Sequence, residues 1–180
     1  KAWKRYWDMQ DIEILSDRPY DQLAIRFALY HLRIMVNTGD SRVGIGAKGL
    51  TGESYKGHSF WDTEIFLLPF YFFTQPQTAR TLLIYRFKGL QSARNKAREN
   101  GFRGAMYPWE TAGLDDGEVT PLWGAADVVT GHPLPILTGL LEQHITADVA
   151  YAVWQYYLAT GDQTFLDEYG YEILLETGRI

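Results

Sequence analysis

Three short stretches of the sequence place a carboxylate beside a tryptophan or a histidine. They are Phe60-Trp61-Asp62-Thr63-Glu64, Pro108-Trp109-Glu110 and Glu142-Gln143-His144. Tryptophan offers a flat apolar face with one N–H donor, and a carboxylate accepts two hydroxyl hydrogen bonds at once. Together these groups suit the C–H face and the hydroxyl rim of a sugar ring. The pattern therefore predicts a carbohydrate pocket.

The first two stretches also have structural explanations. Asp62 and Glu64 could cap a helix and pair with its dipole, and Trp109-Glu110 could be a loop anchored by a buried indole. As a further alternative, Asp62 and Glu110 could form an acid–base pair. All three groups, however, fall where a long loop meets, or should meet, a helix end. Their coincidence at such junctions favours the pocket.

A glycine motif precedes the first stretch. Residues 44–49, Gly-Ile-Gly-Ala-Lys-Gly, match the G-x-G-x-x-G dinucleotide fingerprint, which requires a preceding strand and a following helix. Here more loop follows instead. Lys48 and Lys56 could bind an anion among the glycine amides, but a solvated loop that packs tightly at its glycines fits the flanking sequence better.

Metal and nucleophilic chemistry have little support in the sequence. The four histidines, His31, His58, His132 and His144, lack metal-ligand spacing such as i, i+4. No serine or histidine lies in a nucleophile-elbow context. We therefore expect neither a metal site nor a cofactor.

Composition limits the class of protein. The 180 residues are 46% hydrophobic, carry a net charge of −5 and include no cysteine. This length allows one domain with a real core, the absence of a basic run argues against a nucleic-acid partner, and disulfides are excluded. No apolar stretch reaches the roughly 18 residues that span a bilayer, and the N-terminus lacks a signal-peptide pattern. We expect a cytoplasmic protein with no membrane partner.

Helix signals dominate the chain and predict an all-α fold of long antiparallel helices. The expected helices cover about 17–36, 59–73, 77–100, 138–160 and 162 to the end. A short strand is expected at 11–15, and the segments 37–57 and 102–137 are expected to be irregular. Both ends have helical patterns without a terminating signal, so we expect the chain to be a piece of something larger.

Individual residues mark the expected helix ends. Ser59 would cap the second helix, with Asp62 in the acidic place of a capping box, and Pro69 should kink or break it. Gly101 and Gly161 occupy the glycine position that ends helices. Asp162 should then cap the last helix directly after Gly161, which predicts a tight helix–turn–helix.

Longer stretches resemble glycoside hydrolase family 65. They are "GAKGLTGESYKGHSFWDTEIFLLPF", "GFRGAMYPWET" and "EQHITADVAYAVWQYYLATGD", and the opening "DIEILSDRPYDQLAIRFALYHL" resembles the start of that family's catalytic domain. The resemblance implies an (α/α)6 barrel of which this chain holds about the first half. Residues 17–180 would form the N-terminal half of the catalytic domain, and residues 1–16 the end of a linker helix and the segment leading into it.

The family comprises inverting disaccharide phosphorylases acting on maltose, trehalose, kojibiose and related α-glucosides. The resemblance implies that phosphate, a co-substrate, attacks the anomeric carbon while a carboxylic acid protonates the departing oxygen. Trp61, Asp62, Trp109 and Glu110 match residues that hold the non-reducing glucose, and His144 lies near the same pocket. The general acid is a glutamate in a later segment, so no catalytic residue is expected in this chain.

Two other functions remain open at this point. The chain could belong to a hydrolase on the same helical barrel that uses water instead of phosphate, or it could be a non-catalytic carbohydrate-binding fragment. The expected partners are the disaccharide, phosphate and the remainder of the catalytic domain. We expect the full-length enzyme to be a homodimer.

Overall fold

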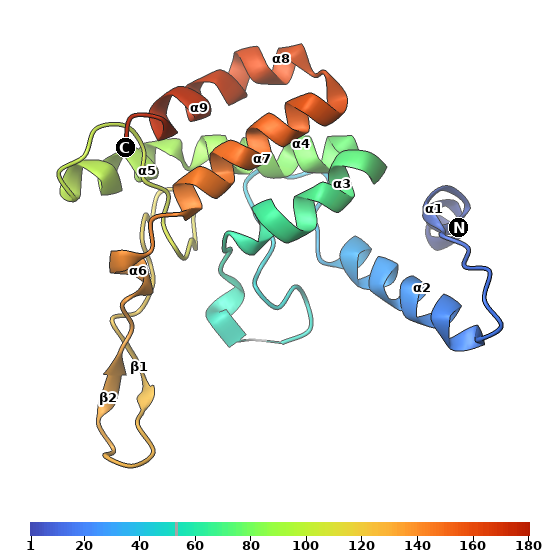
Figure 1. The fold of residues 1–180 in the computed structure, drawn as a ribbon, viewed down its shortest axis with the longest axis horizontal. Helices are drawn as coiled ribbons and strands as arrows, with labels where there is room; N and C mark the ends of the chain where they lie inside the picture. Colours follow the sequence, from blue (N-terminus) through green and yellow to red (C-terminus); the bar gives the residue numbers. More distant parts are fainter. Residues whose placement is uncertain (53) are drawn as a thin grey trace.

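The computed structural model describes residues 1–52 and 54–180, and the architecture is helical (Figure 1). The α-helices are α1 (Ala2–Gln10), α2 (Pro19–Ile34), α3 (Leu68–Thr74), α4 (Pro76–Lys88), α5 (Leu90–Glu99), α6 (Thr138–Leu141), α7 (Ile145–Thr160), α8 (Gln163–Phe165) and α9 (Tyr171–Thr177). A 3-10 turn, η1 (Ser54–Gly57), and two π-helical turns, η2 (Thr63–Leu67) and η3 (Leu166–Gly170), complete the helical segments. Strands β1 (Trp123–Ala126) and β2 (Pro133–Pro135) pair antiparallel as a projecting hairpin. The prediction of a helical protein is confirmed.

Helix α7 lies at the centre of the core. It packs against α3, α4 and α9, which lie around it in Figure 1. Its buried side chains recur every three to four positions, the spacing that keeps one helical face toward a core. They are Ile145, Thr146, Val149, Ala152, Val153 and Tyr156. This helix begins directly after His144, so the packing of α7 also fixes that histidine.

The predicted turn between the last two long helical segments is confirmed. Gly161 ends α7 in the left-handed conformation, with φ of 64°. The Asp162 carboxylate then accepts a hydrogen bond from the Phe165 amide at 2.9 Å and caps α8. Gly101, with φ of 81°, likewise follows the end of α5.

The predicted cap at Ser59 is wrong. Ser59 forms backbone bridges with Gly46 and Thr111 instead, and the helix begins four residues later, as the π-turn η2. Asp62 occupies the N-cap position of η2, but its side chain makes no capping hydrogen bond. The expected interruption near Pro69 is confirmed. The amide of Leu68, the first residue of α3, donates to the Thr63 carbonyl five residues earlier, which is the π-helical spacing.

Several element boundaries differ from expectation. The helix expected over 77–100 is divided at Gly89 into α4 and α5, and the one expected over 138–160 is divided into α6 and α7. The hairpin β1–β2 was not expected, because prolines at both ends of β2 argue against a strand.

The strand predicted at 11–15 is also wrong. These residues have no regular secondary structure, and a side chain takes the place of a partner strand. The Gln22 amide donates to the Ile12 carbonyl at 2.9 Å and accepts from the Ile14 amide at 2.8 Å. Two backbone groups of this segment are therefore satisfied by a glutamine of α2 rather than by a sheet.

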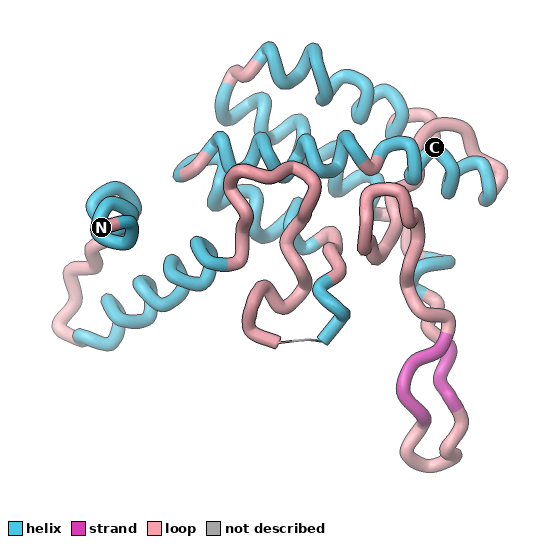
Figure 2. Tube along the Cα trace, turned by 180° about the vertical axis from the view of Figure 1, so that it is seen from behind, coloured by secondary structure: helices cyan, strands magenta, loops and turns pink. Residues whose placement is uncertain are grey.

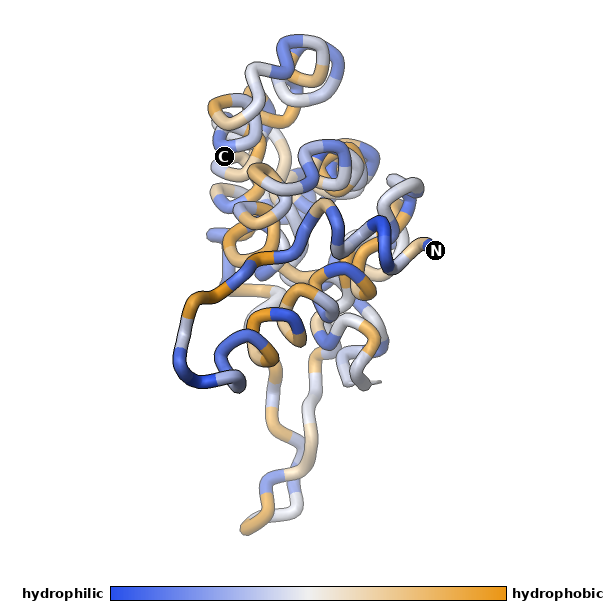
Figure 3. Tube along the Cα trace, turned by 90° about the vertical axis from the view of Figure 1, so that its right-hand side faces the viewer, coloured by the Kyte–Doolittle hydropathy of each residue, from blue (hydrophilic) through white to orange (hydrophobic). Residues whose placement is uncertain are grey.

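Helices α1 and α2 lie to one side of the core (Figure 1). Hydrogen bonds tie them to each other and to α3, from the Tyr6 hydroxyl to the Leu29 carbonyl and from the Tyr71 hydroxyl to the Leu32 carbonyl. The apolar face of α2 that contains Leu23 and Phe27 stays uncovered, since these side chains are 63% and 64% exposed. Figure 3 shows apolar and polar segments interspersed on this side. Across the described residues, no helix has both the length and the apolar character needed to cross a bilayer.

The two long connections project from the same side of the helical layer. One links α2 to η2, and the other links α5 to α6 and carries the hairpin, as Figures 1 and 2 show from opposite directions. The predicted pocket residues 61–62 and 109–110 lie on or just after these connections.

Candidate carbohydrate site

Backbone bridges bring the first two predicted groups together. The Ser59 amide donates to the Thr111 carbonyl at 2.9 Å, and the Thr111 amide donates to the Ser59 carbonyl at 3.0 Å. Ser59 also bridges Gly46 of the glycine loop. Because Trp61 and Trp109 each lie two residues from this antiparallel pair, their side chains are held near each other.

The aromatic rings form one cluster that includes the third group. The ring centroids of Trp61 and Trp109 are 6.5 Å apart with the planes inclined at 48°. The imidazole of His144 stands edge-on to both, at 4.9 Å from Trp61 and 5.9 Å from Trp109. Residues from the two loops and from the start of α7 thus meet at one place.

An open cavity of about 360 Å³ lies beside this cluster. Most of the residues that line the cavity are aromatic. The lining residues are Ala47, Lys48, Tyr55, Phe60, Trp61, Asp62 and Trp109. Asp62 is exposed and does not cap the helix behind it. Its carboxylate is therefore available to accept hydrogen bonds from a ligand, between indole faces that can cover an apolar ring surface.

Glu110 occupies a different position from Asp62. It is 5% exposed, and its Oε1 accepts a hydrogen bond from Nδ1 of His58 at 2.7 Å. Glu110 is absent from the lining of the cavity, although the adjacent Trp109 is part of it. The structure thus places Trp61, Asp62 and Trp109 at the cavity and His144 against the two indoles. Glu110 lies outside the cavity lining and is oriented by His58, a histidine that the sequence analysis did not select.

Glu64 has a structural role at the base of the same turn. Its carboxylate forms a two-point ion pair with Arg86, at 2.7 and 2.8 Å, and both side chains are buried. Arg86 also donates to the Phe60 carbonyl at 3.0 Å. Burial acts to lower the pKa of Arg86, but the Glu64 carboxylate raises it above its ordinary value. The pair fixes the turn that presents Trp61 and Asp62.

Tyr107 fixes the approach to the second group. Its hydroxyl donates to the Arg86 carbonyl at 2.9 Å, and its amide donates to Oγ1 of Thr146 on α7 at 3.0 Å. Tyr107 is fully buried, and burial raises the pKa of its hydroxyl above the ordinary range. Residues 107–110 are therefore attached to both α4 and α7.

Glu118 is a further residue that the sequence analysis missed. Its carboxylate accepts hydrogen bonds from the amides of Trp109 and Glu110, from Thr120 and from the Lys96 ammonium. Burial acts to raise the pKa of Glu118, but the hydrogen bonds from Lys96, Thr120 and Trp109 hold it below its ordinary value. Glu118 lies in an irregular segment and matches no motif, so the sequence carries no signal for this role.

The glycine motif is a tightly packed loop and lacks the structure of a dinucleotide-binding fingerprint. A side chain at Gly44 would approach Ser59 Oγ to 2.4 Å and Tyr85 Cε1 to 2.8 Å. The segment that follows Gly49 is turn and loop instead of the helix that the fingerprint requires. Lys48 lines the aromatic cavity, with its ammonium 5.9 Å from the Tyr55 ring centroid.

His144 is paired with a carboxylate, but this pair is not part of a metal site. Nδ1 of His144 lies 2.6 Å from Oδ2 of Asp148, one turn further along α7, which orients the ring toward the tryptophans. Across residues 1–52 and 54–180, no group of three or more acidic or histidine side chains is placed to hold a metal ion.

The central catalytic domain model of glycosyl hydrolase family 65 matches residues 26–180 of the chain. A kojibiose phosphorylase from Halothermothrix orenii is 57% identical over 179 residues, which is 99% of this chain and 23% of that protein. A kojibiose hydrolase from Flavobacterium johnsoniae is 41% identical over 177 residues, 98% of this chain and 24% of that protein.

A solved structure from the human microbiome, provisionally assigned as a kojibiose phosphorylase, superimposes with a TM-score of 0.83. It is 30% identical, and the match covers 99% of this chain and 24% of that one. The chain thus spans about a quarter of the length of the curated relatives it matches.

Proposed function

Because this chain belongs to glycosyl hydrolase family 65, we propose that it forms the N-terminal part of the catalytic domain of a disaccharide phosphorylase. Residues 17–180 would contribute about half of an (α/α)6 barrel, and residues 1–16 would lead into it from a linker helix. The helical architecture, the family match from residue 26 and the phosphorylase relative support this proposal. The uncovered apolar face of α2 is compatible with further helices packing there.

The role of this part is to supply the donor-glucose subsite. Trp61 and Trp109, with centroids 6.5 Å apart, would cover the apolar faces of a glucosyl ring, and Asp62 would accept hydrogen bonds from its hydroxyls. Glu110, fixed by His58, and His144, fixed by Asp148, would complete the site. The observation that carries the proposal is the exposed Asp62 carboxylate beside two converging indoles.

The reaction follows the inverting two-group scheme with phosphate in place of water. A phosphate oxygen forms a bond to the anomeric carbon while the bond from that carbon to the leaving sugar breaks. A carboxylic acid gives its proton to the departing oxygen, and β-glucose 1-phosphate and a free sugar result. That acid would be a glutamate outside this chain, so the residues described here bind and orient. Kojibiose is the first substrate to test, because the 57% identical relative carries that name.

The substitution Asp62→Ala in the natural full-length protein tests the subsite. We expect phosphate-dependent release of glucose 1-phosphate from kojibiose to fall by about two orders of magnitude or more, because lost orientation at the reacting centre has effects of this size. Asp17→Ala, at an exposed position ahead of α2, is the matched control and should keep wild-type rates. Turnover of Asp62→Ala within a few-fold of wild type would contradict the assignment.

A hydrolase is the second candidate, supported by the 41% identical kojibiose hydrolase. The two activities differ in their dependence on phosphate. A phosphorylase consumes phosphate and forms glucose 1-phosphate, whereas a hydrolase forms glucose at the same rate in phosphate-free buffer. A protein that binds the disaccharide without breaking it under either condition would instead be a carbohydrate-binding module.

A further inference from the structure

We propose that Glu118 is a positioning residue of the glucosyl subsite, because its carboxylate fixes the backbone that carries Trp109 and Glu110. The inference rests on the function proposed for that subsite. Glu118 itself does not line the cavity and would not touch the sugar.

Both oxygens of the Glu118 carboxylate are fully engaged. Oε2 accepts from the Trp109 amide at 2.8 Å and from the Lys96 ammonium. Oε1 accepts from the Glu110 amide at 3.2 Å and from the amide and hydroxyl of Thr120 at 3.1 and 2.7 Å. Five donors thus meet a group with about four lone-pair sites. Two consecutive amides on one carboxylate leave the intervening peptide little freedom to rotate.

The surroundings of Glu118 make this arrangement rigid. The Lys96 side chain comes from α5 and is only 6% exposed, so the ion pair joins the loop to a core helix. Gly139 of α6 also lies close to Glu118, because a Cβ added there would be 3.1 Å from Glu118 Cδ. The position of the Trp109 indole is therefore set by α5 and α6, through a residue nine positions further along the loop.

The test compares Glu118→Gln with Lys96→Met in the full-length protein. Glutamine replaces one acceptor oxygen with a donor, so it repels one of the two amides. Lys96→Met removes the ion pair but keeps both amide bonds. We expect Glu118→Gln to raise KM for the disaccharide about tenfold or more, with KM for phosphate unchanged. Lys96→Met should lower Tm to a similar extent while changing KM for the disaccharide less than about threefold.

Two outcomes would overturn the proposal. One is an unchanged disaccharide KM in Glu118→Gln, and the other is an equal rise in both variants, which would indicate a general structural effect. A crystal structure of Glu118→Gln separates this inference from the proposed function. If the Trp109 indole keeps its place, the positioning role is wrong whatever the activity. If the indole moves but the wild-type protein cleaves no disaccharide, the proposed function has failed instead.

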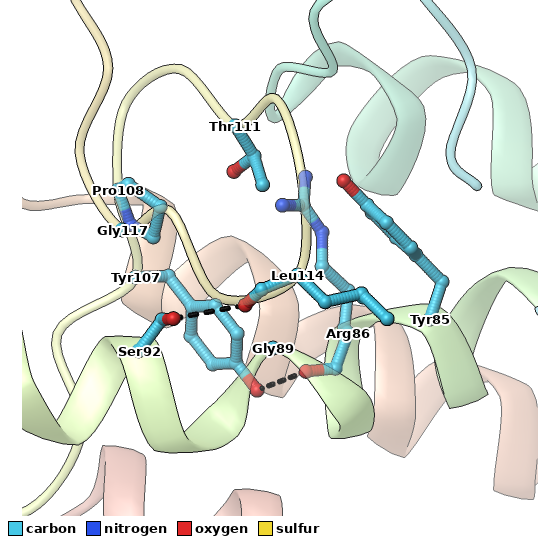
Figure 4. A pocket seen from close by; sticks show the side chains of 9 residues that line it. All are labelled: Tyr85, Arg86, Gly89, Ser92, Tyr107, Pro108, Thr111, Leu114 and Gly117. Atoms are coloured by element: carbon cyan, nitrogen blue, oxygen red, sulfur yellow. Dashed lines mark hydrogen bonds between the residues drawn. The ribbon is translucent and has the colours of Figure 1, made fainter. Parts of the chain in front are cut away.

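A different observation supports a second inference, a bound water molecule beneath the site. A cavity of about 10 Å³ lies among residues of α4, α5 and the loop that follows α5, including Tyr85, Arg86, Tyr107, Pro108 and Thr111. The hydroxyls of Tyr85 and Thr111 are buried and have no hydrogen-bond partner among the described residues. Figure 4 shows both residues beside the Arg86 guanidinium at this cavity.

We infer that one water molecule joins Tyr85 to Thr111. The volume is close to the minimum that holds a single water, and two to four polar partners are what such a site needs. A buried hydroxyl without a partner is costly, so a space of this size beside two such hydroxyls is expected to hold a water molecule. Since Thr111 forms the bridge to Ser59, this water would tie the bridge to α4.

The sign of a stability change tests this water. In the full-length protein, Thr111→Val and Tyr85→Phe should each lower Tm, because each removes a hydrogen bond to the water. If the cavity is dry, each substitution removes an unsatisfied hydroxyl, so Tm should stay constant or rise. A high-resolution crystal structure should show one ordered water in the cavity of the wild-type protein. An empty cavity with both hydroxyls unpaired would overturn the inference.

Discussion

Ser59 and Thr111 exchange both of their backbone hydrogen bonds, at 2.9 and 3.0 Å, although they are 52 positions apart in the sequence. This antiparallel pair joins the two long connections, next to the hydrogen bond between His58 and Glu110. The side chains that follow Ser59 and precede Thr111 therefore converge, and Trp61 meets Trp109. The candidate site thus depends on a two-residue bridge between loops. Hydrogen bonds with α4, α5 and α7 hold the segments on either side of this bridge.

Removal of the Glu64 charge should destabilise the fold strongly. Glu64→Gln leaves the Arg86 guanidinium buried without its counter-ion, and breaking one partner of such a pair has a cost of about 3–5 kcal/mol. Denaturant-induced unfolding of the full-length protein measures the change. The exposed ion pair between Asp40 and Arg42 supplies the control, because Asp40→Asn should leave the denaturant midpoint of unfolding unchanged. Equal effects of the two substitutions would show that the buried pair is not an anchor.

Gly104 should tolerate no side chain, whereas Gly101 should tolerate one with moderate strain. Both have positive φ, of 86° and 81°. A Cβ at Gly104 would approach the Glu176 carbonyl oxygen to 2.2 Å, but nothing lies within 4 Å of one at Gly101. Gly101→Ala should therefore cost about 1–2 kcal/mol, and Gly104→Ala clearly more, as compared by Tm. Similar Tm values for the two variants would contradict the close contact with α9.

Asp162 should make stability depend on pH in the acidic range. Burial acts to raise the pKa of Asp162, but the Phe165 amide, the Tyr156 hydroxyl and Arg80 lower it below its ordinary value of 3.8. A lowered pKa stabilises the fold above the unfolded value, and this contribution disappears as pH falls through the folded value. Asp162→Asn keeps a capping oxygen but loses the charge. Its Tm should lie below wild type at pH 7, and the gap should close below about pH 3.8. A gap that persists at low pH would contradict the charge as the cause.

Local signals in the sequence predicted the helical class and the tight turn at residues 161–162. Gly161 adopts the left-handed conformation that ends a helix, and the Asp162 side chain accepts from an amide three residues later. Both features depend only on residues close together in the sequence. The convergence of residues 61, 109 and 144 was expected from their shared position at loop–helix junctions and from the family resemblance. The bridge between Ser59 and Thr111 that produces it is a long-range contact with no local pattern.

Long-range partners also explain what the sequence analysis missed. Ser59 looked like a helix cap, but pairing with Thr111 satisfies its backbone instead. Glu118 lies in a loop without a motif, and its role follows from its bonds to the amides of Trp109 and Glu110 and from its ion pair with Lys96 on α5. His58 has no metal-ligand spacing, and its partner Glu110 is 52 positions away. In each case the deciding atom belongs to a distant segment, which periodicity and capping patterns do not report.

The most direct measurement is a crystal structure of the natural full-length protein with glucose or kojibiose bound. The account predicts a glucosyl ring in contact with the indoles of Trp61 and Trp109, with a ring hydroxyl donating to the carboxylate of Asp62. A glucosyl ring bound away from these side chains, or an Asp62 carboxylate turned away from a ring that occupies the cavity, would contradict it.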